Sequence, residues 1–286
     1  MKKLLFQLDT DHFASVFDTV VCYDGGADHV IGHAGVTPEN FAPLVDGAIF
    51  TRAPKEKKNT AIFIGGSNVS AGQDLLVAVQ KRFFMGFQVS VMMDSNGCNT
   101  TAAAGVAKLA LSGSLAGKKA VVLGGTGPVG QRAAVMLAQE GAEVTITSRH
   151  IFSAEEACYA MQQRFGVNLI PREAADSDAR GDAVKDAQIV FATGAAGVEL
   201  LKPEHWENNP NIELLADANA TPPLGIGGTD MMDKGIDRHG KIVWGAIGFG
   251  ALKLAVHRAC IAKLFEDNTL IYDAEEIFAL AKAMAA

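Results

Sequence analysis

Residues 121–134, VVLGGTGPVGQRAA, contain glycines at a spacing suited to binding a phosphate group. Gly125, Gly127 and Gly130 form a G-x-G-x-x-G pattern between an apolar β-branched run and an alanine-rich run. In this pattern the first glycine makes a tight turn, the second lets a pyrophosphate approach the backbone, and the third lets a helix pack closely on a strand. A tight turn at a sheet edge is the alternative, but it does not need three glycines. The residues expected at this dinucleotide site are Gly125, Thr126, Gly127, Pro128, Val129 and Gly130.

The end of the next strand, at 143–149, indicates which dinucleotide binds. A cofactor without a 2′-phosphate usually meets an Asp or Glu there, which accepts a hydrogen bond from the ribose. This chain has no carboxylate at that point, and instead offers Ser148 and Arg149. Arg149 can pair with a dianionic phosphate while Ser148 donates to it. The pattern therefore favours NADP and leaves NAD open as a second cofactor, with a solvated loop arginine as the alternative.

Two later loops are candidates for the nicotinamide end of the cofactor. Thr193, Gly194 and Ala195 follow the third strand of this half, and small residues there allow a ring to pass close to the backbone. Asn219 lies at the end of the fourth strand, at the start of the segment NATPPLGIGG. For Asn219, a plain loop is an equally good interpretation.

In the first part of the chain, DSNGCNTTAAAG at 94–105 places polar residues between a strand and a small-residue helix. Ligands of open α/β sheets lie outside the carboxyl ends of the strands, so this loop predicts a substrate contact. The expected substrate-binding residues are Asp94, Asn96, Asn99 and Thr101. Helix capping by Asp94 or Asn99 is the alternative, although capping needs only one such residue.

A second candidate for substrate binding lies near the end of the chain. Lys253 and His257 are four residues apart in a helical pattern and so share one face. They could hold an anionic part of a substrate, and a solvated basic face is the alternative. Asp94 and Lys253 are the candidate catalytic residues.

Strands alternate with helices along the chain, which predicts an α/β fold with two domains and a cleft between them, the second a Rossmann-type parallel sheet. The linker-like segment SGSLAGKK at 112–119 separates the halves, and helices at 251–265 and 273–286 are expected to return to the first domain. This predicts a substrate domain of residues 1–112 plus 251–286 and a dinucleotide domain of residues 113–250. The expected strands are 2–9, 47–52, 60–66 and 88–94 in the first domain, and 118–125, 143–149, 188–194 and 212–218 in the second.

Composition restricts the class of protein and partner. The 286 residues are 49% hydrophobic and carry a formal net charge of −7, which argues against nucleic acid or an anionic membrane surface as the partner. No apolar run approaches the roughly 20 residues of a membrane span, and the N-terminal run is too short for a signal peptide. Four cysteines without C-x-x-C spacing predict reduced thiols in a cytoplasmic protein and no metal site.

Taken together, the motifs resemble those of the bacterial NAD(P)-dependent methylene-tetrahydromethanopterin dehydrogenases, within the methylene-tetrahydromethanopterin/methylene-tetrahydrofolate dehydrogenase family. The resemblance covers essentially the whole chain and rests on YDGGADH, DSNGCNTTAAAG, GGTGPVG, NATPPLGIGG and LKLAVHRACIAKLFE. It implies one domain for a pterin and one for NADP, and a one-carbon pathway that oxidises formaldehyde toward formate. It also implies a homo-oligomer, expected to be a trimer.

The implied chemistry fits the residues present. Hydride leaves a methylene carbon flanked by two nitrogens and no proton moves, so no general acid–base pair is needed. The Tyr-x-x-x-Lys pair that a bifunctional folate dehydrogenase–cyclohydrolase uses for its second activity is absent. Three alternatives stay open: methylene-tetrahydrofolate as the carrier, a shikimate-type dehydrogenase and a non-catalytic NADP-binding protein. The shikimate type would need a lysine paired with Asp94, and none is suitably placed.

Overall fold

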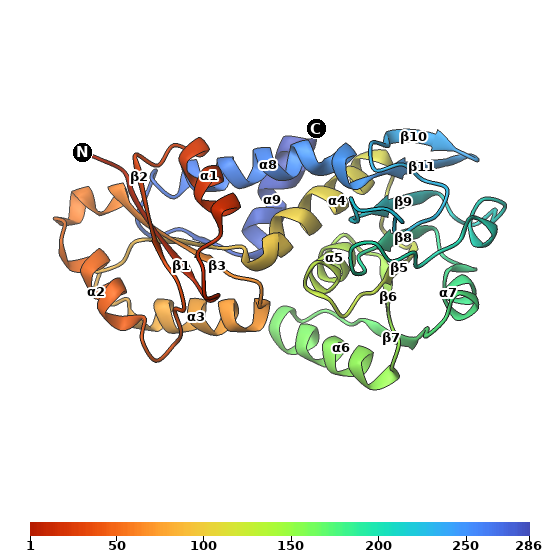
Figure 1. The fold of residues 1–286 in the computed structure, drawn as a ribbon, viewed down its shortest axis with the longest axis horizontal. Coiled ribbons are helices and arrows are strands. Elements are labelled where there is room, and N and C mark those ends of the chain that lie inside the picture. The colour runs from red at the N-terminus through yellow and green to blue at the C-terminus, as the bar shows by residue number, and fades with distance from the viewer. The chain divides into compact units, whose positions relative to one another are not determined.

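The computed structural model describes all 286 residues and divides into two compact units (Figure 1). Unit 1 comprises Met1–Thr100 and Leu254–Leu280, and unit 2 comprises Thr101–Lys253 and Ala281–Ala286. Each unit contains its own sheet flanked by helices, which confirms the predicted α/β class. The division falls inside three helices, α4 (Cys98–Ser112), α8 (Ala246–Lys263) and α9 (Ala274–Ala285), rather than in the segment 112–119. The assignment of pterin and NADP to separate domains remains a proposal.

Unit 1 is built on a five-stranded sheet in the order β12-β4-β3-β1-β2, with every neighbouring pair parallel. Its strands are β1 (Leu4–Asp9), β2 (His29–His33), β3 (Thr60–Gly65), β4 (Ser90–Met93) and β12 (Ile271–Tyr272). Its helices are α1 (Val16–Asp24), α2 (Ala42–Phe50), α3 (Val69–Arg82), the part of α8 from Leu254 onward and most of α9 (Ala274–Ala285), with short 3-10 turns at Pro54–Asn59 and Ser95–Gly97. Every residue of β3 and β4 is buried, as expected for parallel strands covered on both faces.

The strand expected at 47–52 is wrong. Residues Ala42–Phe50 form helix α2, and its buried residues Val45, Ala48 and Ile49 recur at helical spacing against the sheet. A short apolar run fits a buried strand and a buried helix face equally well, so its hydrophobicity alone could not decide. The strand β2, with histidines at both ends, was missed for the opposite reason, because it has little apolar content.

Unit 2 is built on a seven-stranded sheet in the order β10-β11-β9-β8-β5-β6-β7. The strands are β5 (Lys119–Leu123), β6 (Glu143–Ser148), β7 (Ile170–Glu173), β8 (Ile189–Ala192), β9 (Leu214–Asp217), β10 (Lys234–Arg238) and β11 (Lys241–Trp244). Helices α5 (Pro128–Gln139), α6 (Ile151–Phe165) and α7 (Ser177–Val184) and a 3-10 turn at Pro203–His205 connect them. Six strands run parallel, β10 is antiparallel, and the parallel order is that of a Rossmann sheet with its crossover between β5 and β8.

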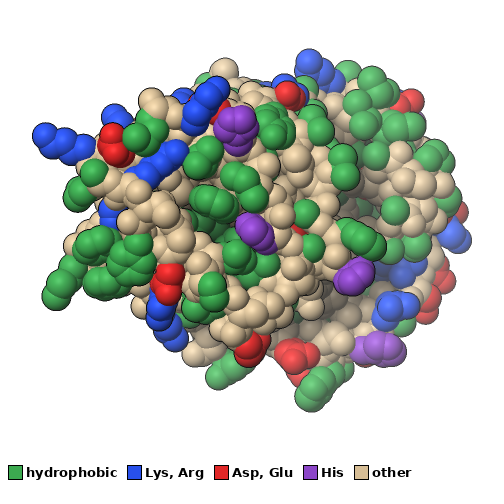
Figure 2. Space-filling view, turned by 60° about the vertical axis from the view of Figure 1, so that its left-hand side comes forward, with side chains coloured by type: hydrophobic (Ala, Val, Ile, Leu, Met, Phe, Trp, Pro, Cys, Tyr) green, Lys and Arg blue, Asp and Glu red, His purple; other side chains and the backbone are tan.

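The distribution of charged side chains and the lengths of the helices agree with what the composition indicated about nucleic acid and membranes. On the face drawn in Figure 2, basic side chains are scattered among acidic and hydrophobic ones and do not form a continuous stripe. None of the helices combines the length and the apolar character needed to cross a bilayer.

Candidate functional site

The glycine loop lies between β5 and α5, and packing inside the protein requires two of its glycines. A Cβ atom on Gly125 would lie 2.7 Å from Cβ of Ile146, on the adjacent strand β6. A Cβ atom on Gly130 would lie 2.6 Å from Oγ1 of Thr193 and 2.7 Å from Cα of Gly125. A side chain at Gly125 would therefore press on β6, and one at Gly130 would force α5 away from the glycine loop.

Gly127 is different, because the protein itself leaves room for a side chain there. Its Cβ would meet nothing closer than the carbonyl oxygen of Gly124 at 3.6 Å, and its φ of −74° is open to any residue. Gly127 is the N-cap of α5, and no side chain caps this end of the helix or places an acidic group in its first turn. The open space and the unsatisfied N–H groups together fit a pyrophosphate approaching the backbone.

The end of β6 provides the residues predicted for a 2′-phosphate. Ser148 is half-buried, and Arg149 is exposed and forms no ion pair. Thr147 ties this strand end to the glycine loop, because its Oγ1 accepts the N–H of Gly124 at 3.2 Å. A carboxylate that sequence analysis missed also reaches this turn: Glu173, at the end of β7, accepts the N–H of Ile151 at 2.9 Å.

Two residues predicted to contact the nicotinamide use their side chains within the protein. Oγ1 of Thr193 donates to the carbonyl oxygen of Leu123 at 3.0 Å. The amide of Asn219 accepts the N–H of Thr221 at 2.9 Å and donates to the carbonyl of Pro223 at 3.1 Å. Asn219 therefore shapes a loop that contains a cis peptide bond before Pro223.

That loop is held by Asp217, a residue that sequence analysis did not single out. Asp217 ends β9, is 1% exposed, and accepts the N–H groups of Asn219 at 2.9 Å and Ile226 at 2.8 Å. Burial raises the pKa of its carboxyl from 3.8 to about 6, against backbone hydrogen bonds that lower it. A Cβ on Gly225 would lie 2.8 Å from Oδ1 of Asp217, so the loop needs glycine there.

In unit 1, the structure places Asp94 inside the protein rather than at its surface. Its carboxylate is fully buried and accepts the N–H groups of Asn99 at 2.8 Å and Thr100 at 3.1 Å. It also accepts the hydroxyl of Thr100 at 2.6 Å. Asn99 is buried as well, with Nδ2 donating to the carbonyl of Met93 and to Oδ1 of Asp273. Both residues anchor the first turn of α4.

His257 lies beside Asp94 in unit 1. It is fully buried, stacks on Phe63 with ring centroids 5.4 Å apart, and places Nδ1 3.9 Å from Oδ2 of Asp94. The solvated basic face considered as an alternative is wrong for this residue. Lys253, one turn earlier in α8, is half-buried.

The surface around this polar loop has both polar and apolar residues. Asn96 is exposed with a left-handed φ of 56°, and its N–H donates to the carbonyl of Gly66. Thr101, the first residue of unit 2, is half-buried. After β1, Phe13 and Val16 are 79% and 78% exposed, an apolar feature that sequence analysis missed. Exposed aromatic and aliphatic side chains at the carboxyl end of a strand are suited to packing against a flat ring.

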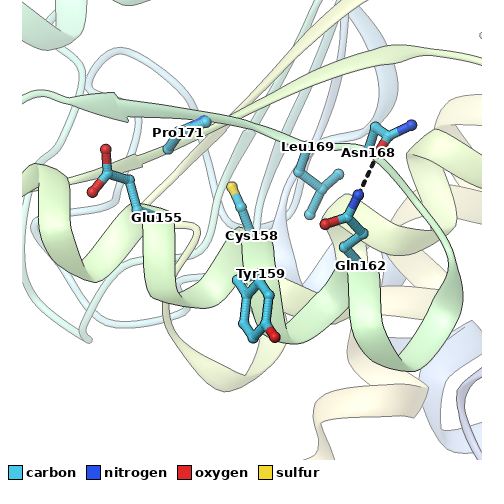
Figure 3. Close-up of a pocket in the computed structure, with 7 residues that line it drawn as sticks. All are labelled: Glu155, Cys158, Tyr159, Gln162, Asn168, Leu169 and Pro171. Atoms are coloured by element: carbon cyan, nitrogen blue, oxygen red, sulfur yellow. Dashed lines mark hydrogen bonds between the residues drawn. The ribbon is translucent and has the colours of Figure 1, made fainter.

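A separate cavity of about 250 Å³ lies between α6 and β7 (Figure 3). It is lined by Glu155, Cys158, Tyr159, Gln162, Asn168, Leu169 and Pro171. A hydrogen bond of 3.1 Å joins Gln162 to Asn168 at its edge. Burial, with Glu155 nearby, raises the pKa of the Cys158 thiol to about 11, which keeps it protonated and unreactive. The cavity contains none of the predicted site residues.

Comparison with known proteins identifies the family. A family model described as "Methylene-tetrahydromethanopterin dehydrogenase, N-terminal" matches residues 16–96. The chain is 57% identical to the bifunctional protein MdtA of Methylorubrum extorquens over 99% of both chains. It is 31% identical, again over 99% of both, to the NAD(P)-dependent methylenetetrahydromethanopterin dehydrogenase of the same organism. The chain belongs to the methylene-tetrahydromethanopterin dehydrogenase family.

These identities confirm the resemblance that the sequence motifs indicated, and they do so over 99% of each relative. Among solved structures, the ligand-free 5-ketofructose reductase of Gluconobacter sp. aligns with a TM-score of 0.57 at 16% identity, covering 99% of both chains. At that identity the likeness supports the α/β fold and says nothing of the substrate.

The glycine loop yields a matched pair of predictions. Gly127→Val should abolish NADP binding while the protein stays folded, because only a bound pyrophosphate would meet the new side chain. Gly130→Ala should instead lower the melting temperature, because its Cβ would press on Thr193 and Gly125. Cofactor titration and thermal melts of both variants measure this. A Gly127→Val protein that is folded and retains NADP affinity would place the dinucleotide elsewhere.

Asp217 predicts a pH dependence of stability. Between about pH 4 and pH 6 the native carboxyl holds a proton that the unfolded chain has released, so the free energy of unfolding falls as the pH rises. The pKa difference corresponds to about 3 kcal/mol. Asp217→Asn should lack this part of the slope in denaturant titrations across that range, whereas Asp186→Asn, at an exposed position, should keep it. Identical slopes in all three proteins would contradict the assignment.

Proposed function

We propose that this protein transfers a hydride reversibly from methylene-tetrahydromethanopterin to NADP, giving methenyl-tetrahydromethanopterin, in a one-carbon pathway that oxidises formaldehyde. The observation that carries the proposal is the space at Gly127 beside an uncapped helix N-terminus, since nothing in the protein itself requires glycine there. Full-length identity of 31% to a protein named for this activity supports the choice of substrates.

In this proposal the chain binds and orients, and moves no proton. NADP, when bound, supplies the acceptor for the hydride. The glycine loop holds its pyrophosphate, and Ser148 and Arg149 hold its 2′-phosphate. Because the product is a cation stabilised by its own two nitrogens, the rate depends on geometry and on nearby charge rather than on an acid–base pair.

The pterin is assigned to residues of the segment that begins at Asp94 and leads into α4, together with residues of α8. Asn96 is exposed, Thr101 and Lys253 are half-buried, and each is proposed to contact the pterin directly. Asp94, Asn99 and His257 are buried, so we assign them to positioning the loop. The negative charge of Asp94 would in addition favour a cation that forms at this loop.

The proposal extends to the setting of the enzyme. The four cysteines are free and buried, which supports a cytoplasmic location. A homo-oligomer, with a trimer as the expected form, follows from the resemblance, and size-exclusion chromatography with light scattering would measure it.

The reaction is tested by supplying each methylene carrier, tetrahydromethanopterin and tetrahydrofolate, with each of NADP and NAD, and following the absorbance of the reduced nicotinamide. Turnover with methylene-tetrahydromethanopterin and NADP is the expected result. Turnover with the folate carrier alone would replace the substrate, and cofactor binding without turnover would leave an NADP-binding protein.

Arg149 should decide affinity for the 2′-phosphate. Arg149→Ala removes a charge-assisted contact and should weaken NADP by about 10- to 100-fold while leaving NAD nearly unchanged. Lys119→Ala, which removes an exposed charge at the opposite end of the same sheet, is the control. Equal losses for both cofactors in the Arg149 variant would remove Arg149 from the 2′-phosphate site.

Asp94→Asn separates positioning from charge stabilisation. The substitution keeps the shape and one acceptor oxygen but removes the charge, so weakened anchoring should raise the Michaelis constant for the pterin roughly 10-fold with a smaller change in kcat. If the buried charge stabilises the product cation instead, kcat should fall by about 10- to 1,000-fold. Asp74→Asn, an exposed carboxylate on α3, controls for net charge. Unchanged kinetics would leave Asp94 as a helix cap only.

A further inference from the structure

A carboxylate from β7 reaches the turn that follows β6. The two strands run parallel, with Ser148 directly paired to Glu173. Oε2 of Glu173 accepts the N–H of Ile151, the first residue of α6, at 2.9 Å. The Glu173 side chain is exposed, and Arg149 lies in the same short turn between Ser148 and Ile151.

This placement bears on the choice between cofactors. Enzymes that prefer a ribose 2′-hydroxyl carry an acidic residue at the end of the strand equivalent to β6. Here β6 ends in Ser148 and Arg149, but the neighbouring strand brings a negative charge to the same turn. A carboxylate there accepts a hydrogen bond from a hydroxyl and repels a phosphate dianion, so it opposes Arg149.

We propose that Glu173 is a specificity-determining residue that raises affinity for NAD and restrains affinity for NADP. The proposal rests on the proposed function, because it takes the turn 148–151 as the binding site of the adenosine ribose.

Glu173 also caps α6, so the test must keep that hydrogen bond. The N-cap residue of α6, His150, makes no side-chain cap, and the carboxylate of Glu173 takes its place. Glu173→Gln retains an acceptor oxygen at this position and removes only the charge. A variant that merely loosened the start of α6 would weaken both cofactors alike, since they share the same adenosine.

The experiment measures dissociation constants of NADP and NAD for the full-length protein, for Glu173→Gln and for a matched control. The control is Glu143→Gln, which removes an exposed charge at the start of β6, the far end of the same strand. We expect Glu173→Gln to shift the ratio of the two affinities toward NADP by about 3- to 10-fold, and Glu143→Gln to leave it unchanged. At about 1 M salt, where charges are screened within roughly 3 Å, the shift should largely disappear.

An unchanged ratio, or a shift toward NAD, would overturn the role of Glu173 while leaving the proposed function intact. A shift that persists undiminished at high salt would also overturn it, because the effect would then not be electrostatic. Absence of binding of either dinucleotide to the unmodified protein would overturn the proposed function and this inference together.

Discussion

Three aspartates buried at the carboxyl ends of strands impose the main constraint on this structure. Asp9 ends β1, Asp94 directly follows β4 and Asp217 ends β9, and none is more than 1% exposed. A buried carboxylate is costly unless hydrogen bonds replace its hydration. Each is satisfied by backbone N–H groups of the segment that follows it: Asp11 and Ser15 for Asp9, Asn99 and Thr100 for Asp94, and Asn219 and Ile226 for Asp217. These hydrogen bonds hold the segment after each strand in one conformation, because its backbone donates to a carboxylate buried in the protein.

In unit 2 this constraint extends from one loop to the next. Ala192 pairs with Asp217 across β8 and β9, so the segments after these strands begin side by side. The carbonyl oxygen of Gly225 accepts the N–H groups of Leu200 and Leu201, and the N–H of Gly227 donates back to Leu201. A ring bound against these segments would meet backbone whose position is already determined, which lowers the entropy lost on binding.

The sequence predicted the parts of this arrangement that depend on local pattern. The glycine loop, its flanking strand and helix, and the absence of an acid at the end of β6 all follow from adjacent residues. Asp94 and Asn219 were assigned to ligands because a polar residue after a strand looks the same whether it faces solvent or holds a loop. The position of Glu173 could not be predicted from the sequence. Its strand β7 is a four-residue edge strand containing Pro171, which is too short to be recognised as a strand or to be assigned as the neighbour of β6.

The structure thus separates residues that the fold itself explains from residues that it does not. Asp94, Asn219 and Gly130 are accounted for by hydrogen bonds or close packing inside the protein. Gly127 and Arg149 have no such explanation: one leaves space that no protein atom fills, and the other is an exposed charge without a partner. A hydride transfer without proton movement needs its reacting rings held in place and needs little else from side chains. Such a reaction is served by a rigid fold whose buried polar groups are hydrogen-bonded within the protein, with a few residues such as Gly127 and Arg149 left to bind the ligands.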